Sequence, residues 1–294
     1  MKERYVFGIG ELLFDLLPDG KHLGGAPVNF AFHLFRCGFR AYPVSAVGRD
    51  DNGDELLRAV GGKGLPTDGI SRNDLPSGTA GVRILGDGNM FFISEPAAWD
   101  RIVPSDDLLG KAGFASAVCF GTLAQRGEWN RNAIRSFLRH IPDAALRIFD
   151  VNFRQEYFSE TVLLDSLPLC NVLKVSEEEY PVLEKSLRLS GTATDALGRL
   201  AEKYRLRSVL FTRGENGASV FSGGLWRHRK AEFCPCVADT VGCGDGFTSF
   251  WTAAVLNGKD DAEALEIAGK AASFIAGKSG AMPEMPEEII RLLK

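Results

Sequence analysis

Residues 239–246 read Asp-Thr-Val-Gly-Cys-Gly-Asp-Gly, and an apolar run with helical spacing follows through Phe247, Phe250 and Trp251. The pattern predicts a glycine-rich turn that leads directly into a helix over residues 243–257. Glycines allow the backbone to approach a ligand closely, and the free N–H groups at a helix start attract anions without a cationic side chain. The segment therefore predicts an anion-binding turn at the start of a buried helix.

Asp245 lies at or near the start of this helix. It could be an N-cap, since Asp is a favoured capping residue. It could also be a catalytic base, because a base that touches both a transferred phosphoryl group and a hydroxyl needs the open space that flanking glycines leave. The helix N-terminus would favour the carboxylate and make it a weak base, which suffices where the proton leaves late.

Short strand-like runs alternate with helix-like stretches outward from this turn. The strands expected from hydrophobic patterning cover residues 5–10, 42–47, 117–120, 147–151, 172–175, 208–212, 218–221 and 225–231. Helices are expected over residues 28–37, 128–140 and 261–277, with Gly38 near the C-cap of the first. This alternation predicts a mostly parallel sheet covered by helices on both faces.

A different pattern interrupts the alternation. The β-rich runs 79–85 and 90–94 are joined by Gly86-Asp87-Gly88-Asn89, which is typical of a hairpin. We expect a small inserted sheet that acts as a lid, formed by segments of approximately 12–22 and 79–103. Because the sequence shows no internal repeat and no low-complexity linker, a single domain over residues 1–294 is expected.

Composition excludes several classes of protein. The chain has 294 residues, of which 45% are hydrophobic, and a formal net charge of −4 without a dense run of Lys or Arg. We therefore expect a globular protein that binds neither nucleic acid nor a membrane surface. No apolar run reaches the roughly 20 residues of a membrane span, so a cytoplasmic location is expected. The close pair Cys234 and Cys236 lacks the further ligands of a zinc site, and reduced thiols are expected.

A second glycine-rich segment, Leu23-Gly24-Gly25-Ala26-Pro27-Val28-Asn29-Phe30, opens the first predicted helix. It matches neither a dinucleotide-binding fingerprint nor a Walker sequence. A Gly-Gly pair followed by Asn suits a backbone that lies close to a small polar ligand, with the amide reaching a hydroxyl. An ordinary strand-to-helix turn would also explain it.

The two segments, in this order and roughly 220 residues apart, resemble the ribokinase or phosphofructokinase-B (PfkB) family of carbohydrate kinases. The resemblance covers essentially the whole chain. It implies a ribokinase-like three-layer α/β/α sandwich with a mainly parallel central sheet and a small β lid. It further implies Asp245 as base, the backbone of Gly242, Cys243 and Gly244 as anion hole, and a sugar site made by Asp15, Gly24, Gly25 and Asn29.

Asp15, after the Gly10–Phe14 strand exit, could instead be a solvated turn residue. Asp150-Val151-Asn152-Phe153-Arg154 resembles a segment of fructokinase-like members, in which Arg154 could contact substrate or phosphate, or form a structural ion pair. In Lys174-Val175-Ser176-Glu177-Glu178-Glu179, Glu179 would organise Mg²⁺ through water. Ser176 and Glu179 also have the spacing of a capping box, and both roles are compatible.

The resemblance also implies an ATP site. Thr212-Arg213-Gly214-Glu215-Asn216-Gly217 matches the family's turn at the nucleotide, which places Thr212, Gly214 and Gly217 there together with Gly244. Ala272 and Gly277 resemble one wall of the adenine pocket, although helix packing explains small residues equally well. Cys243 and Phe250 depart from the small residues usual at these places, which puts the pocket width in question and leaves Cys243 open to oxidation.

The segment Glu95-Pro96-Ala97-Ala98-Trp99-Asp100 is similar to fructokinase-like sequences, and Trp99 could stack on a sugar or anchor the lid as core. The function expected is ATP-dependent phosphorylation of a monosaccharide, with fructose first and 2-keto-3-deoxygluconate, ribose or another sugar as alternatives. A sugar acid would need a cation such as Arg83, Arg101 or Arg154. A non-catalytic sugar- or ATP-binding regulator is the alternative of another class. Mg²⁺ with ATP, a monovalent cation such as K⁺, and a homodimer formed through the lid are also expected.

Overall fold

The computed structural model describes residues 4–17, 19–85 and 88–294. Within them, a nine-stranded sheet has the order β13-β12-β11-β10-β9-β8-β1-β4-β5. Its strands are β1 (Tyr5–Ile9), β4 (Arg40–Gly48), β5 (Ile70–Asn73), β8 (Ala115–Gly121), β9 (Leu146–Asp150), β10 (Val172–Ser176), β11 (Ser208–Thr212), β12 (Ala218–Ser222) and β13 (Leu225–Arg229). All neighbours from β11 to β5 pair in parallel, whereas β12 and β13 are antiparallel. The expected mainly parallel sheet is confirmed.

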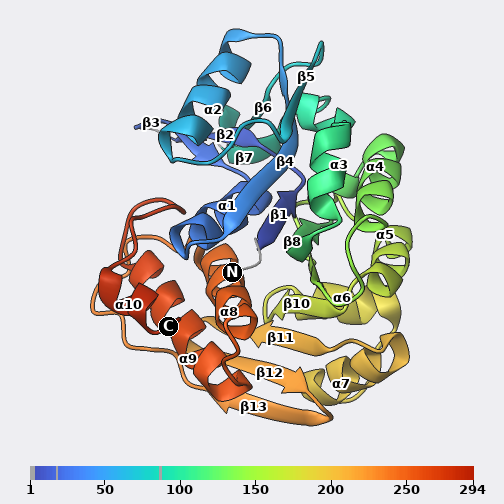
Figure 1. The fold of residues 1–294 in the computed structure, drawn as a ribbon, viewed down its shortest axis with the longest axis vertical. Helices are drawn as coiled ribbons and strands as arrows, with labels where there is room; N and C mark the ends of the chain where they lie inside the picture. Colours follow the sequence, from blue (N-terminus) through green and yellow to red (C-terminus); the bar gives the residue numbers. More distant parts are fainter. Residues whose placement is uncertain (1–3, 18, 86–87) are drawn as a thin grey trace.

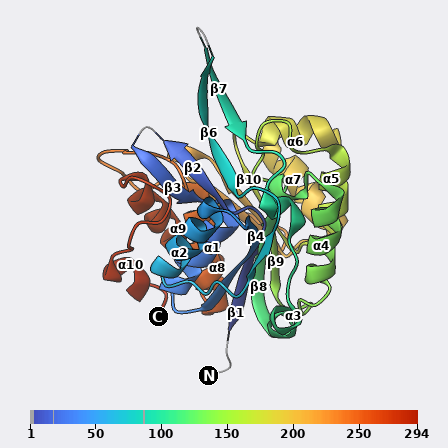
Figure 2. The same cartoon turned by 90° about the horizontal axis from the view of Figure 1, so that it is seen from above.

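Helices cover both faces of this sheet (Figures 1 and 2). One layer contains α1 (Ala26–Arg36), α2 (Asp51–Gly62), α8 (Cys243–Leu256), α9 (Asp261–Ala276) and α10 (Glu287–Arg291). The other contains α3 (Asp106–Ala112), α4 (Glu128–Leu138), α5 (Glu160–Ser166), α6 (Tyr180–Leu187) and α7 (Ala193–Tyr204). Short 3₁₀ turns lie at Ala98–Arg101, Leu123–Gln125, Leu167–Leu169 and Gly214–Asn216. The result is the expected three-layer α/β/α sandwich.

Two apolar cores fill the spaces between the layers. On β1, Val6 packs into the core beneath α1 and α8, while Phe7 packs into the opposite core beneath α4. On β10, Val172 packs into the first of these cores and Leu173 into the second. Successive side chains of a strand point to opposite faces, so strands buried on both faces need the continuous apolar runs that the sequence shows.

A second, four-stranded sheet has the order β3-β2-β6-β7 and consists of β2 (Leu13–Leu17), β3 (Gly20–Gly24), β6 (Gly78–Leu85) and β7 (Gly88–Ile93). Figure 2 shows β6 and β7 projecting beyond the main body. The two runs expected as strands are present, while residues 86 and 87 of the expected turn lie outside the described residues. Asp15 was expected to follow a strand, but it lies within β2 opposite His22 of β3, so the turn interpretation was wrong.

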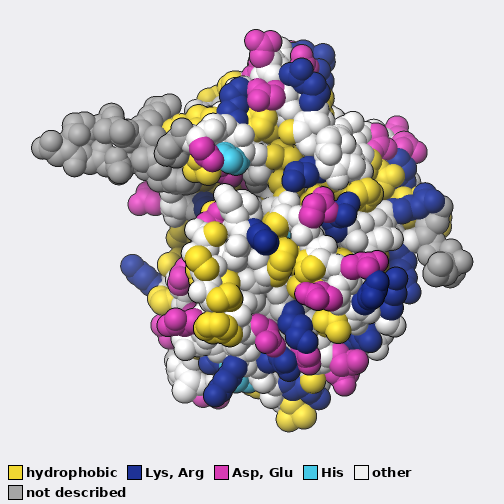
Figure 3. All heavy atoms as spheres, turned by 90° about the vertical axis from the view of Figure 1, so that its left-hand side faces the viewer, with side chains coloured by type: hydrophobic (Ala, Val, Ile, Leu, Met, Phe, Trp, Pro, Cys, Tyr) yellow, Lys and Arg dark blue, Asp and Glu magenta, His cyan; other side chains and the backbone are white. Residues whose placement is uncertain are grey.

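The other expected elements agree with the structure to within a few residues at their ends. Gly38 follows the C-cap residue Cys37 of α1 with φ of 89°, a conformation that favours glycine. Strand β5 was not predicted, because its sequence, Ile-Ser-Arg-Asn, carries little hydrophobic signal. In the described part of the chain, no helix is both long enough and apolar enough to cross a membrane. On the face shown in Figure 3, basic and acidic side chains are interspersed.

Candidate active site

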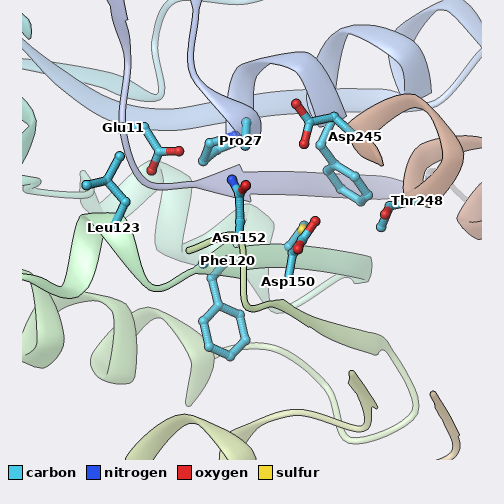
Figure 4. A pocket seen from close by; sticks show the side chains of 12 residues that line it. Glu11, Pro27, Phe120, Leu123, Asp150, Asn152, Asp245 and Thr248 are labelled. Atoms are coloured by element: carbon cyan, nitrogen blue, oxygen red, sulfur yellow. The ribbon is translucent and has the colours of Figure 1, made fainter. Parts of the chain in front are cut away.

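A cavity lies at the edge where β1, β8 and β9 end and where α1 and α8 begin. Open α/β sheets bind ligands beyond the carboxyl ends of their strands. The cavity is lined by Glu11, Ala26, Pro27, Phe30, Cys119, Phe120, Gly121, Leu123, Asp150, Asn152, Asp245 and Thr248. Figure 4 shows Asn152 between Glu11 and Asp245, with the ring of Phe120 turned away from these polar groups. Three carboxyl groups from distant parts of the sequence therefore share one small space.

Asp245 is held at this cavity by a second side chain. The Nδ2 of Asn29 donates a hydrogen bond of 2.7 Å to Asp245 Oδ2. The N-cap of α8 is Gly242, so the capping interpretation of Asp245 was wrong. Burial raises the pKa of Asp245, and the Asn29 hydrogen bond and the Lys174 ammonium oppose that rise. The raised pKa makes Asp245 a stronger base than an aspartate in water, contrary to the weak base expected from the helix N-terminus.

The turn before α8 is built by close backbone contacts. Gly242 has φ of 76°, and a Cβ placed there would lie 2.4 Å from the Ala281 Cβ. The carboxylate of Asp239 accepts hydrogen bonds from the backbone N–H groups of Val241 (2.5 Å) and Gly280 (2.9 Å). These contacts join the turn to the segment after α9. The first turn of α8 therefore has a fixed direction.

The predicted anion hole consists of the N–H groups of this turn. The Cys243 N–H donates a long hydrogen bond of 3.3 Å to the Thr240 carbonyl. The Gly244 N–H belongs to the helix positions that have no partner inside the helix. A Cβ at Gly244 would meet Lys174, with its Nζ at 3.4 Å. Asp245 of the same helix turn lines the cavity, while the anion-hole role of residues 242–244 stays a prediction.

The residues expected to bind a sugar lie close to one another. A Cβ at Gly24 would lie 2.2 Å from Asp15 Oδ2, and a Cβ at Gly25, whose φ is 118°, would lie 2.4 Å from the Glu11 carbonyl oxygen. Both glycines are therefore required sterically. Burial raises the pKa of the half-buried Asp15, and the charge of Arg154 lowers it. Arg154 itself is exposed, and its guanidinium donates to the Phe153 carbonyl at 3.0 Å.

The buried ammonium group of Lys174 lies among carboxylates and also acts on the charge of Asp245. Lys174 Nζ lies 3.1 Å from Asp150 Oδ1 and 3.6 Å from Glu179 Oε2. The two reciprocal bonds expected between Ser176 and Glu179 are present, since Glu179 Oε2 accepts from the Ser176 N–H at 2.7 Å and the Glu179 N–H donates to Ser176 Oγ at 3.2 Å. The N-cap of α6 is Glu179, however, so these bonds close the turn before the helix and the capping-box interpretation was wrong. Among the described residues, no group of three or more His, Cys, Asp and Glu side chains is arranged to bind a metal. Contact with a metal through water, as expected for Glu179, is compatible with this arrangement.

Several of the residues expected to bind ATP lie at or just after the carboxyl end of β11, which pairs with β10 in the main sheet. Thr212 ends β11, and Gly214 begins the following 3₁₀ turn. Gly217 has φ of 88°, and a Cβ there would lie 2.1 Å from the Arg229 carbonyl oxygen, so this glycine is required for the approach of β13. On α9, Ala272 packs against the core, and Gly277 is the C-cap. Helix packing therefore accounts for Ala272, and its role at the nucleotide stays a proposal.

Glu11 and Asn152 are among the pocket residues that were not assigned a role from the sequence. Glu11 is only 4% exposed and points into the cavity, yet an acidic residue directly after a strand is a weak signal on its own. Asn152 is also buried and has φ of 36°, an uncommon value for a residue with a side chain and one that concentrates at functional sites. Backbone strain of this kind is visible only in the structure.

Phe250 and Trp99 both belong to the core. Phe250 is fully buried, with its ring centroid 6.0 Å from that of His33. It therefore does not narrow the pocket, which the sequence had left open. Trp99 is also fully buried, and the Arg126 guanidinium carbon lies 3.9 Å from its ring centroid. The interpretation of Trp99 as a core anchor is confirmed.

Replacing Glu11 by Gln is expected to stabilise the protein at pH 8 by about 1–3 kcal/mol and to leave it unchanged at pH 4.5. Burial raises the pKa of Glu11 from 4.5 to about 7. The folded state therefore binds more protons between these values, and the free energy of unfolding falls as the pH rises through them. Denaturant unfolding at both pH values measures the effect, with the exposed Glu178→Gln as control. Equal effects at both pH values would contradict the prediction.

Comparisons with known proteins agree with this fold. The family model described as pfkB family carbohydrate kinase matches residues 19–288. The chain is 29% identical to the ribokinase of Arabidopsis thaliana, over 92% of this chain and 72% of that protein. It is 25% identical to fructokinase-2 of Solanum habrochaites, over 98% and 96%. The crystal structure of the Xylella fastidiosa fructokinase with bound ATP has a TM-score of 0.84 at 23% identity and covers 98% of both chains. Because the family model spans most of its length, this chain belongs to the pfkB family of carbohydrate kinases.

Proposed function

We propose that this protein transfers the γ-phosphoryl group of ATP to a hydroxyl of a monosaccharide, with fructose as the first candidate. The observation that carries the proposal is the Asn29–Asp245 pair, which holds a carboxylate between the cavity and the N-terminus of α8. A general base must face its substrate at hydrogen-bond distance, and an anion site must lie beside it. The bound ATP of the similar fructokinase structure supports the same choice of donor.

In the proposed reaction, the sugar hydroxyl lies against Asp245 and the γ-phosphoryl group lies over the N–H groups of Gly242, Cys243 and Gly244. The hydroxyl oxygen bonds to phosphorus while the bond from phosphorus to the β,γ-bridging oxygen breaks. The hydroxyl proton passes to the Asp245 carboxylate, and ADP leaves with the bridging oxygen and its electron pair. The raised pKa of Asp245 increases its capacity to take that proton.

Mg²⁺ would neutralise charge on the phosphates of ATP. We propose that Glu179 contacts it through water. The side chain of Glu179 is partly engaged by Ser176 and Lys174, and Mg²⁺ commonly keeps several of its waters. A monovalent cation near Asp239 is also proposed, although both carboxylate oxygens of Asp239 already accept backbone hydrogen bonds. Carbonyl oxygens of that turn would then be the ligands.

The first test is a coupled ADP-release assay with Mg-ATP across fructose, ribose, 2-keto-3-deoxygluconate, nucleosides and phosphosugars. We expect fructose to give the highest kcat/KM, since fructokinases align over nearly the whole chain. Preference for ribose or a sugar acid would support the proposed kinase activity and replace fructose as the proposed substrate. Sugar binding without ADP release for any acceptor would instead favour a non-catalytic regulator.

Gly24→Ala is expected to raise KM for the sugar by about 10-fold or more and to change kcat less. The added methyl group would lie 2.2 Å from Asp15 Oδ2 and would displace that carboxylate from the sugar. The loss of one hydrogen bond to a charged group corresponds to a change of this size. Gly61→Ala on α2 is the control, because its methyl group would meet no atom within 4 Å. An unchanged KM for Gly24→Ala would remove Asp15 from the sugar site.

We also propose that the small sheet closes over the sugar and pairs with a second copy of the chain. Leu16 and Leu17 at the end of β2 are 37% and 50% exposed, which leaves apolar surface on this sheet. Closure of a lid excludes water, which would otherwise accept the phosphoryl group.

A further inference from the structure

We propose that His33 is a positioning residue that fixes the turn of residues 239–244 from outside the active-site cavity. It acts through the short segment 280–282, which follows α9 and contacts both α1 and that turn. His33 is not among the residues that line the cavity, and its side chain is fully buried. The inference rests on the proposed function of this turn as the anion site for ATP.

The segment 280–282 packs directly against the turn. The Gly280 N–H donates a hydrogen bond of 2.9 Å to Asp239 Oδ2. A Cβ built on Gly242 would lie 2.4 Å from the Ala281 Cβ and 2.6 Å from its Cα. Ala281 thus occupies the space that a side chain at residue 242 would need. Its position therefore limits the conformations that the turn can adopt.

Two side chains from α1 and α2 hold consecutive carbonyl groups of this segment. His33 Nε2 on α1 lies 2.9 Å from the Ala281 carbonyl oxygen. Because a carbonyl oxygen can only accept, Nε2 carries the proton and donates it to this bond. Lys63, the C-cap residue of α2, donates to the Met282 carbonyl at 3.1 Å. The segment is therefore attached to two helices as well as to the turn.

Helix α1 contacts the proposed catalytic groups in two ways. Asn29 and His33 are four residues apart, which places them on the same face of the helix. Asn29 donates directly to Asp245 at 2.7 Å. His33 reaches the turn before Asp245 through Ala281, and a Cβ built on Gly246 would lie 3.7 Å from His33 Nε2. One face of α1 therefore holds the candidate base and, indirectly, the predicted anion hole.

A histidine at this position has a cost that an apolar residue would not have. The His33 ring lies between Phe32 and Phe250, with ring centroids at 5.2 and 6.0 Å. Within the described part of the chain, its buried Nδ1 has no hydrogen-bond partner. Burial lowers the pKa of His33 to about 4, although the Ala281 hydrogen bond opposes this, so the ring is neutral near pH 7. The bond to Ala281 is what the ring provides in return for the unpaired nitrogen.

A purely structural role would be to satisfy the buried Ala281 carbonyl. Loss of the donor would then lower the stability of the protein and leave the ligand affinities of the folded protein unchanged. A positioning role has a further consequence. Without the bond, Ala281 can move away from Gly242, and the N–H groups of the turn are no longer held ready for an anion.

The test compares His33→Leu, which lacks the donor, with His33→Gln, whose Nε2 can replace it. We expect the Kd for Mg-ATP to rise about 10-fold in His33→Leu, as for the loss of one buried hydrogen bond, and to stay within about 2-fold of wild type in His33→Gln. The Kd for the best acceptor of the ADP-release assay should change little in either variant. Asn171→Leu is the control, because it removes a donor to the Ala145 carbonyl, 2.8 Å away, before the start of β10. It should lower stability and keep the affinity for Mg-ATP.

A second measurement needs no substitution. Coupling between two sites is reciprocal, so bound Mg-ATP should strengthen the His33–Ala281 bond. We expect hydrogen exchange of the His33 Nε2–H, followed by NMR in protein with isotope-labelled histidine, to become slower when Mg-ATP is added. The remaining histidines, His22, His140 and His228, are all accessible to solvent, which distinguishes the His33 signal.

Wild-type affinity for Mg-ATP in His33→Leu would overturn the positioning role, as would a failure of His33→Gln to restore the affinity. If His33→Leu does not fold, an exchange rate unchanged by Mg-ATP would overturn it. All of these readouts are made without turnover, which separates the inference from the proposed function. Wild-type protein that binds ATP and phosphorylates no sugar would contradict the proposed function alone, whereas wild-type protein that binds no ATP would overturn both.

Discussion

Asp245→Asn is expected to lower kcat by about 100-fold or more while ATP and sugar still bind. The Asn side chain keeps the shape of Asp245 and cannot accept the proton of the sugar hydroxyl. Because the Asn29 hydrogen bond holds residue 245 in place from α1, the loss should fall on the chemical step. Initial rates at saturating substrate give kcat, and equilibrium titration gives both affinities.

The control for the change of charge is Asp143→Asn, since the side chain of Asp143 is 99% exposed. This variant is expected to keep the wild-type rate. Near-normal turnover by Asp245→Asn would remove Asp245 from the role of base. Loss of nucleotide binding together with turnover would instead assign Asp245 to binding.

Gly242→Ala is expected to destabilise the protein by about 2–5 kcal/mol and to weaken ATP binding strongly. Two costs add here: a residue with a side chain at positive φ costs about 1–2 kcal/mol, and overpacking costs about 1–3 kcal/mol. The backbone at Gly242 has φ of 76°, and the new methyl group would lie 2.4 Å from Ala281 Cβ. Relief of that overlap must move the turn whose N–H groups form the proposed anion hole. Thermal or denaturant unfolding and nucleotide titration measure the two effects.

Gly258→Ala is the matched control for backbone strain. Gly258 has φ of 85°, close to that of Gly242, but an added methyl group would meet no atom within 4 Å. It should therefore show only the cost of the positive φ, about 1–2 kcal/mol, with ATP affinity unchanged. If both variants behave alike, the close contact with Ala281 has no part in shaping the turn.

Most of the architecture could be predicted from local sequence. Strands β9, β10 and β11 are rich in buried apolar residues on both faces, a pattern typical of strands between two layers of helices. Two glycine-rich segments at helix starts predicted both ends of the candidate site. Strand β5 could not be predicted in this way, because its four residues obtain their order from pairing with β4 rather than from their own composition.

The sequence by itself determined which residue types stand at each strand exit and helix start. It thus predicted the candidate base, the proposed anion-binding turn and the glycines of the proposed sugar site. Only the tertiary structure decided their electrostatic states and partners. Asn29 and Asp245 are 216 residues apart and form one hydrogen bond. Burial raises the pKa of Glu11, and carboxylates distant in sequence raise the pKa of the buried Lys174. Desolvation and ion pairing depend on what packs around a group, and that environment is created when the sheet and its two helical layers assemble.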